Sequence, residues 1–521
     1  MVTKGRDWPS MTRAHTLGAA LPGGGHVGCK SGRSCWTGTS LTARIGPHQL
    51  VRLLGDWVSG DGALHDQLSV ALRRLVHAGA LPSGVRLPSE RVLATSLNVG
   101  RRTVEVAFDS LRFEGIFKSR RGDGTYVSVA GRHAVTRGDD RLSTFALTGR
   151  PHSGSFDLRS AALPGLPFVA EEVARLDPGV LAQQVHLHGY QPAGLYELRQ
   201  AVAEYYDALG LPTTTDQILI TSGAQQALRL TAMWLLEPGA RVLIEEPSFR
   251  GAIDVLRRLG AQLYPVPSGV DGIDADALSD AIGQYRPALI VLQSTVQNPT
   301  GSVLEPSRRA SVASLAGEAG IPLIDDIAPS DTQFDGGRPR PLAAYGGPVF
   351  TLGSTSKAFW GGLRVGWVRA DPERITAITL MKSSEDLGTS VLAQIVAERL
   401  LQRIEEARAE RRAVLAGTWR LLREALNELI PEWRLQPPRG GASLWAQLPD
   451  PCATAFAQRA ARKGVLVLPG PTFSSVDGLD DHLRLAFAAA PEEVIAGVER
   501  LAEAWASFRT RWSARAVVKS A

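Results

Sequence analysis

Ser354-Thr355-Ser356-Lys357 lies shortly before Gly361-Gly362-Leu363-Arg364-Val365-Gly366, and these two segments are the most informative part of this 521-residue chain. The chain has seven lysines and fifty arginines, so a lysine in this setting needs a reason other than positive charge. A lysine amine can form a Schiff base with a carbonyl group, whereas an arginine guanidinium stays protonated. Lys357 is therefore a candidate for covalent chemistry.

Three further polar segments lie upstream of Lys357, each next to a predicted strand. They are Thr221-Ser222-Gly223-Ala224-Gln225, Asn298-Pro299-Thr300-Gly301 and Asp325-Asp326. The first opens a predicted helix, so the backbone N–H groups of Ala224 and Gln225 can bind a phosphate with help from the helix dipole. Any one of these segments alone is usually an ordinary feature of a protein surface or strand end. All of them in this order, together with Lys357, are a much more specific sign of one functional site.

Short apolar segments alternate with longer helical ones from residue 154 to residue 512. The clearest predicted strands are residues 217–220, 241–244 and 288–292. This alternation predicts an α/β domain with a mainly parallel sheet covered by helices, and a smaller C-terminal α+β subdomain. We expect a linker at 131–153 before this domain, and a tail at 513–521 after it.

Three helices and a hairpin are predicted ahead of the linker. Apolar periodicity begins the first helix at Leu64, Ser89 can cap the second, and the third begins at Arg101. Residues 116–129 predict a short hairpin with a tight Asp-Gly turn. The order and spacing are those of a winged helix-turn-helix over residues 60–130.

The same region carries a local excess of positive charge. Residues 64–127 contain ten Lys and Arg against six Asp and Glu. A basic excess in this motif favours double-stranded DNA as a partner, because arginines at the helix start and on the wing can reach phosphates. The alternative for a small basic helical module is a solvated surface or a unit that docks onto another protein.

Bulk properties limit the remaining possibilities. Residues 1–50 mix Gly, Ser, Thr and Arg without hydrophobic periodicity, and we expect them to form a disordered leader. No apolar stretch approaches about 18 residues, so we expect a cytoplasmic protein that does not enter a membrane. The three cysteines have no metal-ligand spacing and no disulfide pattern, and no metal site is predicted.

The N-terminal motifs resemble those of the GntR family of bacterial regulators. The resemblance rests on Leu87-Pro88-Ser89-Glu90-Arg91, Val99-Gly100-Arg101-Arg102-Thr103-Val104 and Arg121-Gly122-Asp123-Gly124-Thr125-Tyr126-Val127. It implies DNA contacts from Arg91, Arg101, Arg102 and Thr103, with Arg121 and Gly122 at the wing tip. Gly100 departs from the serine or threonine that many relatives use as a helix cap, and glycine caps slightly less well.

The C-terminal motifs resemble fold-type I aminotransferases, and the whole chain resembles the MocR subgroup of GntR regulators. This resemblance implies pyridoxal 5'-phosphate as the cofactor and Lys357 as the lysine that binds it covalently. It also implies that Asp325 pairs with the pyridine nitrogen and that Asn298 donates to the phenolic oxygen. The residues implied for the cofactor phosphate are Ser222, Gly223, Ala224, Gln225, Ser354, Ser356 and Arg364.

Three more residues are carried over from the same resemblance. Phe249 in Glu246-Pro247-Ser248-Phe249 matches the aromatic ring that stacks on the cofactor. Tyr190 matches a tyrosine that reaches the phosphate bound by a second subunit, which implies a homodimer. Arg484 matches the arginine that pairs with a substrate carboxylate, a bidentate task suited to a guanidinium group.

One position departs from the aminotransferase pattern. Family members place a tyrosine about three residues after the aspartate, where this chain has Ala328. Transamination is therefore less expected than cofactor binding. We expect a DNA-binding transcriptional regulator whose aminotransferase-like domain senses pyridoxal phosphate or a small amino compound. The alternatives are a working aminotransferase with a basic accessory module, and a DNA-binding scaffold without cofactor chemistry.

Overall fold

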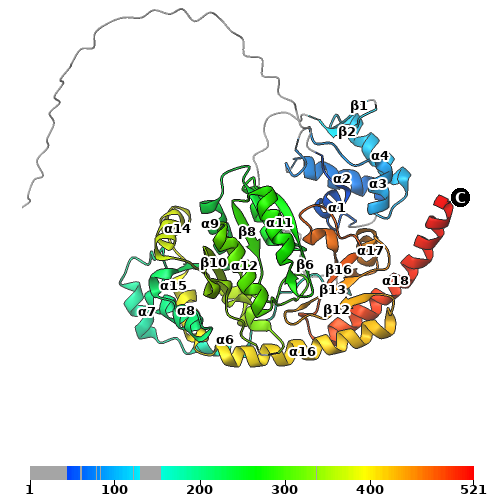
Figure 1. Ribbon diagram of the computed structural model, residues 1–521. Coiled ribbons are helices and arrows are strands. Elements are labelled where there is room, and N and C mark those ends of the chain that lie inside the picture. The colour runs from blue at the N-terminus through cyan, green and yellow to red at the C-terminus, as the bar shows by residue number, and fades with distance from the viewer. Residues whose placement is uncertain are drawn as a thin grey trace, which may run out of the picture. The chain divides into compact units, whose positions relative to one another are not determined.

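The computed structural model of the chain describes residues 44–58, 62–77, 79–82, 84–120, 122–128, 154–335 and 337–520 (Figure 1). The N-terminal module comprises α1 (Pro47–Leu54), α2 (Leu64–His77), α3 (Glu90–Ser96), α4 (Arg101–Phe113), β1 (Phe117–Arg120) and β2 (Gly124–Val127). Helices α2 to α4 and the antiparallel β1–β2 hairpin confirm the predicted winged helix-turn-helix. The expected linker at 131–153 lies outside the described residues.

Local chemistry explains where the helices of this module begin. The Ser89 side chain accepts a hydrogen bond from the Val92 N–H at 3.4 Å, and this cap starts α3. Gly100 occupies the N-cap of α4 and offers no side-chain cap. In the hairpin, Gly122 and Gly124 both have positive φ, which a tight reversal requires and which glycine tolerates.

Helix α1 corrects the expected boundary of the leader. Residues 44–50 were assigned to a disordered leader, yet α1 begins at Pro47 and buries Leu50, Val51 and Leu54 in the core of the winged helix. Eight residues are too few for helical periodicity to emerge from a polar, glycine-rich context. Residues 1–43 lie outside the described part of the chain.

The C-terminal domain is built on an eight-stranded sheet of order β4-β11-β10-β9-β8-β5-β6-β7. Strands β9, β8, β5 and β6 run parallel to one another and to β10, while β11 runs antiparallel to both of its neighbours. The strands are β4 (Ile218–Thr221), β5 (Arg241–Glu246), β6 (Gln262–Gly269), β7 (Gly272–Ile273), β8 (Leu289–Leu292), β9 (Leu323–Asp326), β10 (Val349–Ser354) and β11 (Gly366–Arg369). The mainly parallel sheet confirms the predicted α/β class.

Helices cover both faces of this sheet because successive strand residues alternate between them. On β5, Val242 and Ile244 face one core with α9, α10 and α14, whereas Leu243 faces the other core with α11 and α12. The helices of the domain are α6 (Pro167–Ala174), α7 (Pro178–Val185), α8 (Tyr196–Ala208), α9 (Ala224–Leu235), α10 (Arg250–Arg258), α11 (Ala275–Tyr285), α12 (Pro306–Glu318), α13 (Thr355–Ala358), α14 (Pro372–Glu385) and α15 (Val391–Leu401).

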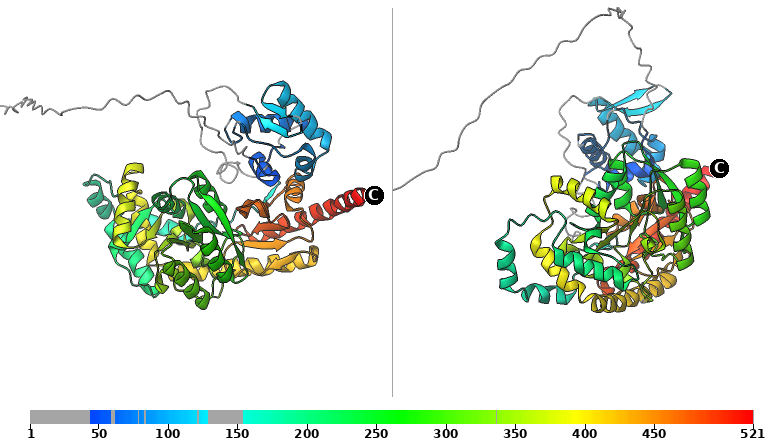
Figure 2. Two further views of the ribbon diagram at one scale, coloured as in Figure 1. Left: turned by 45° about the horizontal axis from the view of Figure 1, so that its top comes forward. Right: turned by 60° about the vertical axis from the view of Figure 1, so that its left-hand side comes forward.

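A smaller α+β subdomain follows, with a four-stranded sheet of order β12-β13-β16-β15. Its elements are α16 (Ile404–Leu429), β12 (Arg434–Gln436), β13 (Ser443–Gln447), α17 (Ala453–Ala461), β14 (Val465–Leu466), β15 (Leu468–Pro469), the 3-10 turn η5 (Gly470–Phe473), β16 (His482–Ala486) and α18 (Pro491–Ser520). Strand β14 pairs instead with β3 (Phe156–Asp157). Helices α16 and α18 pack side by side under this sheet (Figure 2).

The C-terminal boundary also differs from the expectation. A tail was expected at 513–521, but the backbone of α18 continues as helix to Ser520. Among the described helices, none is both long and apolar enough to cross a membrane. The described residues contain no group of His, Cys, Asp and Glu side chains arranged to hold a metal ion.

Leu50 tests whether α1 belongs to the folded winged helix. The Leu50 side chain is fully buried, so we expect Leu50→Ala to destabilise the module by about 2–5 kcal/mol through lost packing and a residual cavity. Val70 on α2 is 58% exposed, and Val70→Ala should change stability by less than about 0.5 kcal/mol. Urea unfolding followed by circular dichroism measures both, and equal midpoints for the two variants would contradict the revised boundary.

Candidate functional site

Lys357 sits on the short helix α13, directly after β10. Its Nζ donates a hydrogen bond to the Ala161 carbonyl at 2.7 Å. The pKa of Lys357 is lowered to about 8, chiefly by burial; the nearby charges of Arg484 and Arg411 act in the same direction, and Asp326 opposes them. Since the ordinary pKa is near 10.5, a much larger fraction of this amine is neutral and nucleophilic at pH 7–8 than in an exposed lysine.

The amine lines a cleft that is open to solvent, with about 370 Å³ of empty space including its mouth. Its walls include Ala161, Asn298, Pro329, Lys357 and Ser443, which come from both the large domain and the C-terminal subdomain. Clefts of this kind, with a few polar groups on mostly apolar walls, are typical ligand sites. Lys357 and Asn298, far apart in sequence, are thus brought to one cavity.

A second set of predicted residues meets beside this cavity, at the ends of three neighbouring strands. Gly366 on β11 pairs with Ser354 of β10 on one side and with Thr221 of β4 on the other. The Arg364 guanidinium donates to the Ser222 carbonyl at 2.7 Å, and the Ser354 hydroxyl donates to the Ser356 Oγ at 2.9 Å. The strand register and these hydrogen bonds therefore bring Ser222, Ser354, Ser356 and Arg364 together.

Backbone geometry gives this cluster the features of an anion cradle. Gly223 has φ +91° and precedes α9, whose first N–H groups, those of Ala224 and Gln225, have no carbonyl partner within the helix. The positive φ favours glycine at this position, and a Cβ there would lie 2.7 Å from an Arg364 nitrogen, so a larger residue would displace the guanidinium. Hydroxyl groups, helix N–H groups and a guanidinium thus surround one space that suits a phosphate.

Asp325 and Asp326 point in different directions, and the geometry corrects the predicted role of the first. Asp325 is fully buried, accepts hydrogen bonds from the Ser294 N–H and hydroxyl at 3.1 and 3.0 Å, and interacts electrostatically with Arg309. Asp326 instead interacts electrostatically with Lys357 and accepts a hydrogen bond from Gln293 Nε2 at 3.1 Å. The carboxylate on the Lys357 side of the strand is that of Asp326, because adjacent strand residues face opposite ways.

Burial raises the pKa of Asp326 to about 6, and hydrogen bonds from the Ala328 N–H and Gln293 oppose the rise. The carboxyl is therefore mainly ionised at neutral pH and can hold a proton on a neighbouring nitrogen. Gln293, which the sequence did not single out, also accepts the Asn298 N–H at 2.9 Å through its Oε1. The Gln293 amide therefore links the Asp326 carboxylate to Asn298. No sequence motif predicts such a link.

Arg484 lies in the same region, on β16. It is almost fully buried, donates to Asn298 Oδ1 at 3.3 Å and donates to the carbonyl of Arg159. The pKa of Arg484 is lowered to about 9, chiefly by burial and also by the charge of Arg250, while Asp157 opposes both. A buried cation beside Asn298 and Lys357 is a natural partner for a ligand carboxylate.

Two aromatic residues occupy different environments. Phe249 caps α10 and is half-buried, with its ring close to Gly251, where an added Cβ would lie 2.5 Å from the ring edge. Since the Gln225 side chain donates to the Gly251 carbonyl at 3.0 Å, Phe249 lies next to the phosphate cradle. Tyr190 is 59% exposed and stacks on His188, and its reach to a second subunit stays a prediction.

No tyrosine stands three residues after either Asp325 or Asp326. Three residues after Asp325 stands Ala328, and three residues after Asp326 stands Pro329, which lines the Lys357 cavity. Neither side chain has a hydroxyl group. The described cavity walls supply no phenol at this point, so the arrangement favours binding more strongly than fast turnover.

The predicted DNA contacts lie on the surface of the winged helix. Arg91 on α3 and Arg102 on α4 are exposed, while Arg101 pairs with Glu105 at 2.7 Å on the same helix. Thr103 is half-buried in the first turn of α4. Gly122 is exposed at the turn between β1 and β2, whereas Arg121 lies outside the described residues.

The residues around Lys357 fit pyridoxal 5'-phosphate. The anion cradle suits its phosphate, Asp326 its ring nitrogen, Asn298 its phenolic oxygen and Lys357 its aldehyde. Gly223 has no side chain beside the Arg364 guanidinium, where a Cβ would lie 2.7 Å from its nearest nitrogen. Four features that suit one cofactor thus come together from separate segments of the chain.

Comparisons with known proteins agree with both halves of the chain. Residues 154–504 match the family model for aminotransferases of class I and II, and residues 64–127 match the model for bacterial regulatory proteins of the gntR family. The HTH-type transcriptional regulator YisV of Bacillus subtilis is 29% identical over 82% of this chain and 93% of its own length. The probable rhizopine catabolism regulatory protein MocR of Rhizobium meliloti is 30% identical over 65% and 71%.

Among solved structures, the chain is similar to LysN, an α-aminoadipate aminotransferase from Thermus thermophilus that was crystallised with N-(5'-phosphopyridoxyl)-L-leucine. The two share 30% identity with a TM-score of 0.63, over 69% of this chain and 94% of LysN. The aminotransferase match covers more than half of the chain, and the GntR match covers the winged helix. This chain therefore belongs to the MocR-type GntR regulators, in which a winged helix-turn-helix is fused to a pyridoxal-phosphate-dependent aminotransferase domain of class I and II.

Proposed function

We propose that this regulator uses the Lys357 cavity to sense pyridoxal phosphate or a small amino compound, and that it works as a cytoplasmic homodimer on DNA. The observation that carries the proposal is the grouping of Asp326 and Arg484 around Lys357, which shares a cavity with Asn298, in a chain with a DNA-binding module. A ligand shifts the equilibrium between two conformations of a regulator only to the extent that it binds one of them more tightly than the other. A cavity walled by two subdomains meets that requirement, since a ligand there contacts both.

When bound, the cofactor supplies an electrophilic aldehyde and an electron-withdrawing ring. Lys357 contributes a buried amine that is neutral above pH of about 8. Asp326 would hold a proton at the ring nitrogen, and Arg484 would orient the carboxylate of an incoming amino compound beside Asn298. An amino compound bound in this cavity would compete with the Lys357 amine for the same site and so change the contacts between the cavity walls.

A second candidate is a working aminotransferase, favoured by the similarity to LysN and by the presence of Lys357, Asp326, Asn298 and Arg484 in one place. The absence of a phenol at Ala328 and Pro329 counts against rapid turnover. Steady conversion of amino acids that depends on an added keto acid, without sequence-selective DNA binding, would support this candidate over the sensor.

The pKa of Lys357 predicts a pH dependence of cofactor capture. Because this pKa is lowered to about 8, the neutral amine increases as pH rises from 7 to 9, and the rate of covalent capture should rise with a midpoint near 8. Stopped-flow absorbance after mixing apoprotein with pyridoxal phosphate measures the rate. Lys357→Ala should abolish the visible band, whereas Lys463→Ala, at an exposed position, should leave it unchanged. A midpoint near 10 would contradict the buried environment.

The two aspartates predict different consequences of the same chemical change. Asp326→Asn removes the carboxylate beside Lys357, so cofactor affinity should fall by about tenfold or more, the worth of one charge-assisted contact. Asp325→Asn removes the anion that offsets buried Arg309 and should cost stability, of order 3 kcal/mol, with a smaller effect on affinity. Cofactor titrations and urea unfolding separate the two, and a reversed pattern would restore Asp325 as the ring partner.

Fluorescence anisotropy with DNA from the region upstream of the gene tests the regulatory proposal. Adding pyridoxal phosphate, and then a panel of amino acids, should change DNA affinity at least several-fold in the wild type and not in Lys357→Ala. Arg102→Ala should weaken binding to all sequences and reduce the salt dependence by about one phosphate contact. Sequence-selective DNA binding whose affinity changes with neither pyridoxal phosphate nor amino acids would refute the sensor function.

A further inference from the structure

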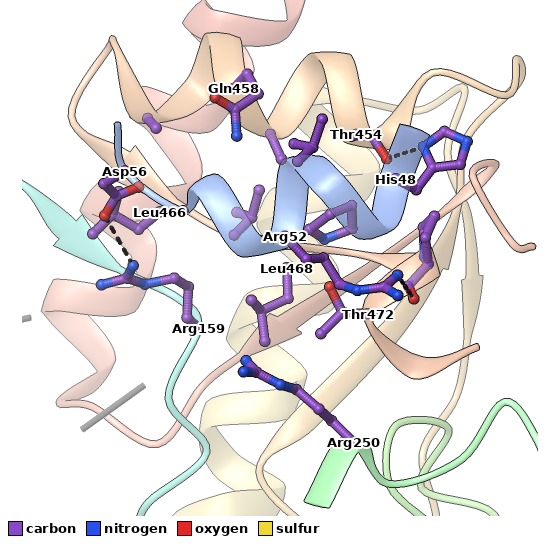
Figure 3. A pocket seen from close by; sticks show the side chains of 17 residues that line it. His48, Arg52, Asp56, Arg159, Arg250, Thr454, Gln458, Leu466, Leu468 and Thr472 are labelled. Atoms are coloured by element: carbon purple, nitrogen blue, oxygen red, sulfur yellow. Dashed lines mark hydrogen bonds and ion pairs between the residues drawn. The ribbon is translucent and has the colours of Figure 1, made fainter. Parts of the chain in front are cut away.

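An open cavity between α1 and the C-terminal subdomain is lined by three arginines, Arg52, Arg159 and Arg250 (Figure 3). Each of them pairs with at least one carboxylate, and the carboxylates are those of Asp56, Asp157, Asp254 and Asp477. These pairs leave the arginines without an excess of positive charge. They are explained as structural contacts.

A different ion pair leads to the phosphate cradle. Lys382 of α14 has a fully buried side chain, and its Nζ donates to Asp386 Oδ1 at 2.7 Å. Asp386 follows α14 directly, and its second oxygen, Oδ2, accepts a hydrogen bond from Gln226 Nε2 at 2.7 Å. Gln226 lies in the first turn of α9, and its Oε1 accepts the backbone N–H of Ser222 at 2.6 Å. Three side chains thus connect a buried lysine to the cradle.

The charge of Asp386 decides which way the Gln226 amide is turned. An ionised carboxylate can only accept hydrogen bonds, so it must face the Nε2 donor of the amide. The Oε1 acceptor then meets the Ser222 N–H. The opposite orientation would place two acceptors together at Asp386 and two donors together at Ser222, so the amide orientation is fixed at both ends.

Several contacts keep Asp386 ionised and in place. Burial by itself would raise the pKa of this carboxyl, but the hydrogen bonds from Lys382 and Gln226 outweigh burial and hold the pKa below its ordinary value. The Gly388 N–H donates to Asp386 Oδ1 at 3.0 Å. Lys382 in turn needs this anion, because a buried ammonium group without a partner is costly. Each member of the pair therefore fixes the other.

The Ser222 peptide is held from both sides. Its N–H donates to Gln226, and its carbonyl accepts a hydrogen bond from the Arg364 guanidinium at 2.7 Å. Gly223 follows and is the N-cap of α9, whose first N–H groups belong to the cradle. A shift of the Ser222 peptide would therefore displace the Arg364 guanidinium together with the start of α9.

We propose that Gln226, oriented by the Lys382–Asp386 pair, is a positioning residue for the cofactor phosphate. It acts through Ser222 and Arg364, because it keeps their groups in fixed places before a ligand arrives. Lys382 and Asp386 lie outside the motifs that the sequence suggested. This role rests on the proposed binding of the cofactor phosphate in the cradle, and it adds the residues that hold the cradle in shape.

Equilibrium dialysis of the full-length protein, freed of cofactor, with pyridoxal phosphate and separately with pyridoxal tests this role. The two ligands differ only in the phosphate, so the ratio of their affinities reports on the cradle. Gln226→Met keeps the length of the side chain and removes both hydrogen bonds. We expect it to lower the affinity for pyridoxal phosphate about tenfold and that for pyridoxal less than about threefold. Asp386→Asn, which permits either amide orientation, should lower the same ratio.

Arg229→Gln is the matched control, because Arg229 also joins α9 to the end of α14, through an ion pair with Glu385 at 2.8 Å. This variant should keep the wild-type ratio. Circular dichroism melting checks that each variant is folded, and Asp386→Asn keeps the test valid if Gln226→Met is not.

Two results would overturn the positioning role while leaving the cradle in place. They are a wild-type ratio in the folded Gln226 and Asp386 variants, and an equal loss of affinity for both ligands, which indicates general loosening of the site. A wild-type protein that binds pyridoxal as tightly as pyridoxal phosphate would overturn the cradle itself, and the role of Gln226 with it. The wild-type ratio therefore separates a failure of the proposed site from a failure of the Gln226 role.

Discussion

The hydrogen-bonded register of β4, β11 and β10 is the constraint on which the cofactor site depends. Gly366 pairs with both Thr221 and Ser354, which places three distant segments in one row. A Cβ on Gly366 would lie 2.6 Å from the carbonyl carbon of Gly223, so only glycine permits this close approach. The phosphate cradle and the position of Lys357 after β10 both follow from this register.

The site also contains several buried ionisable side chains. Lys357, Asp326 and Arg484 are each withdrawn from water, and each has a pKa displaced towards neutrality. Isolated buried charges are costly, so each keeps a polar partner: the Ala161 carbonyl, Gln293 and Asn298 respectively. The same displacement that costs stability makes Lys357 a better nucleophile and leaves Arg484 ready for a carboxylate.

The first helix connects the regulatory and cofactor-binding halves of the chain. Helix α1 contributes Leu50 and Leu54 to the core of the winged helix, and Arg52 and Asp56 to the cavity against the C-terminal subdomain. Its two faces therefore serve two different contacts. Arg159 extends the connection, since its side chain pairs with Asp56 and its carbonyl accepts from Arg484.

Sequence reasoning predicted the long, periodic elements and missed those that depend on context. Apolar periodicity and capping residues predicted α2 to α4, and alternating apolar strands predicted the parallel sheet. Helix α1 was missed because eight residues in a polar setting carry too little periodicity, although packing buries three of them. The same reasoning set the tail at 513, within a helix that continues to Ser520.

The sequence by itself determined which chemical groups this protein has: a lysine after Ser-Thr-Ser, an amide before Pro-Thr-Gly, two adjacent acids and a basic helical module. Only the tertiary structure decided which acid faces Lys357, because neighbouring strand residues point to opposite faces and the sequence does not say which face is the cavity. It also decided that Arg52, Arg159 and Arg250 share a cavity. Groups separated by about a hundred residues or more meet through packing, which local sequence patterns do not encode.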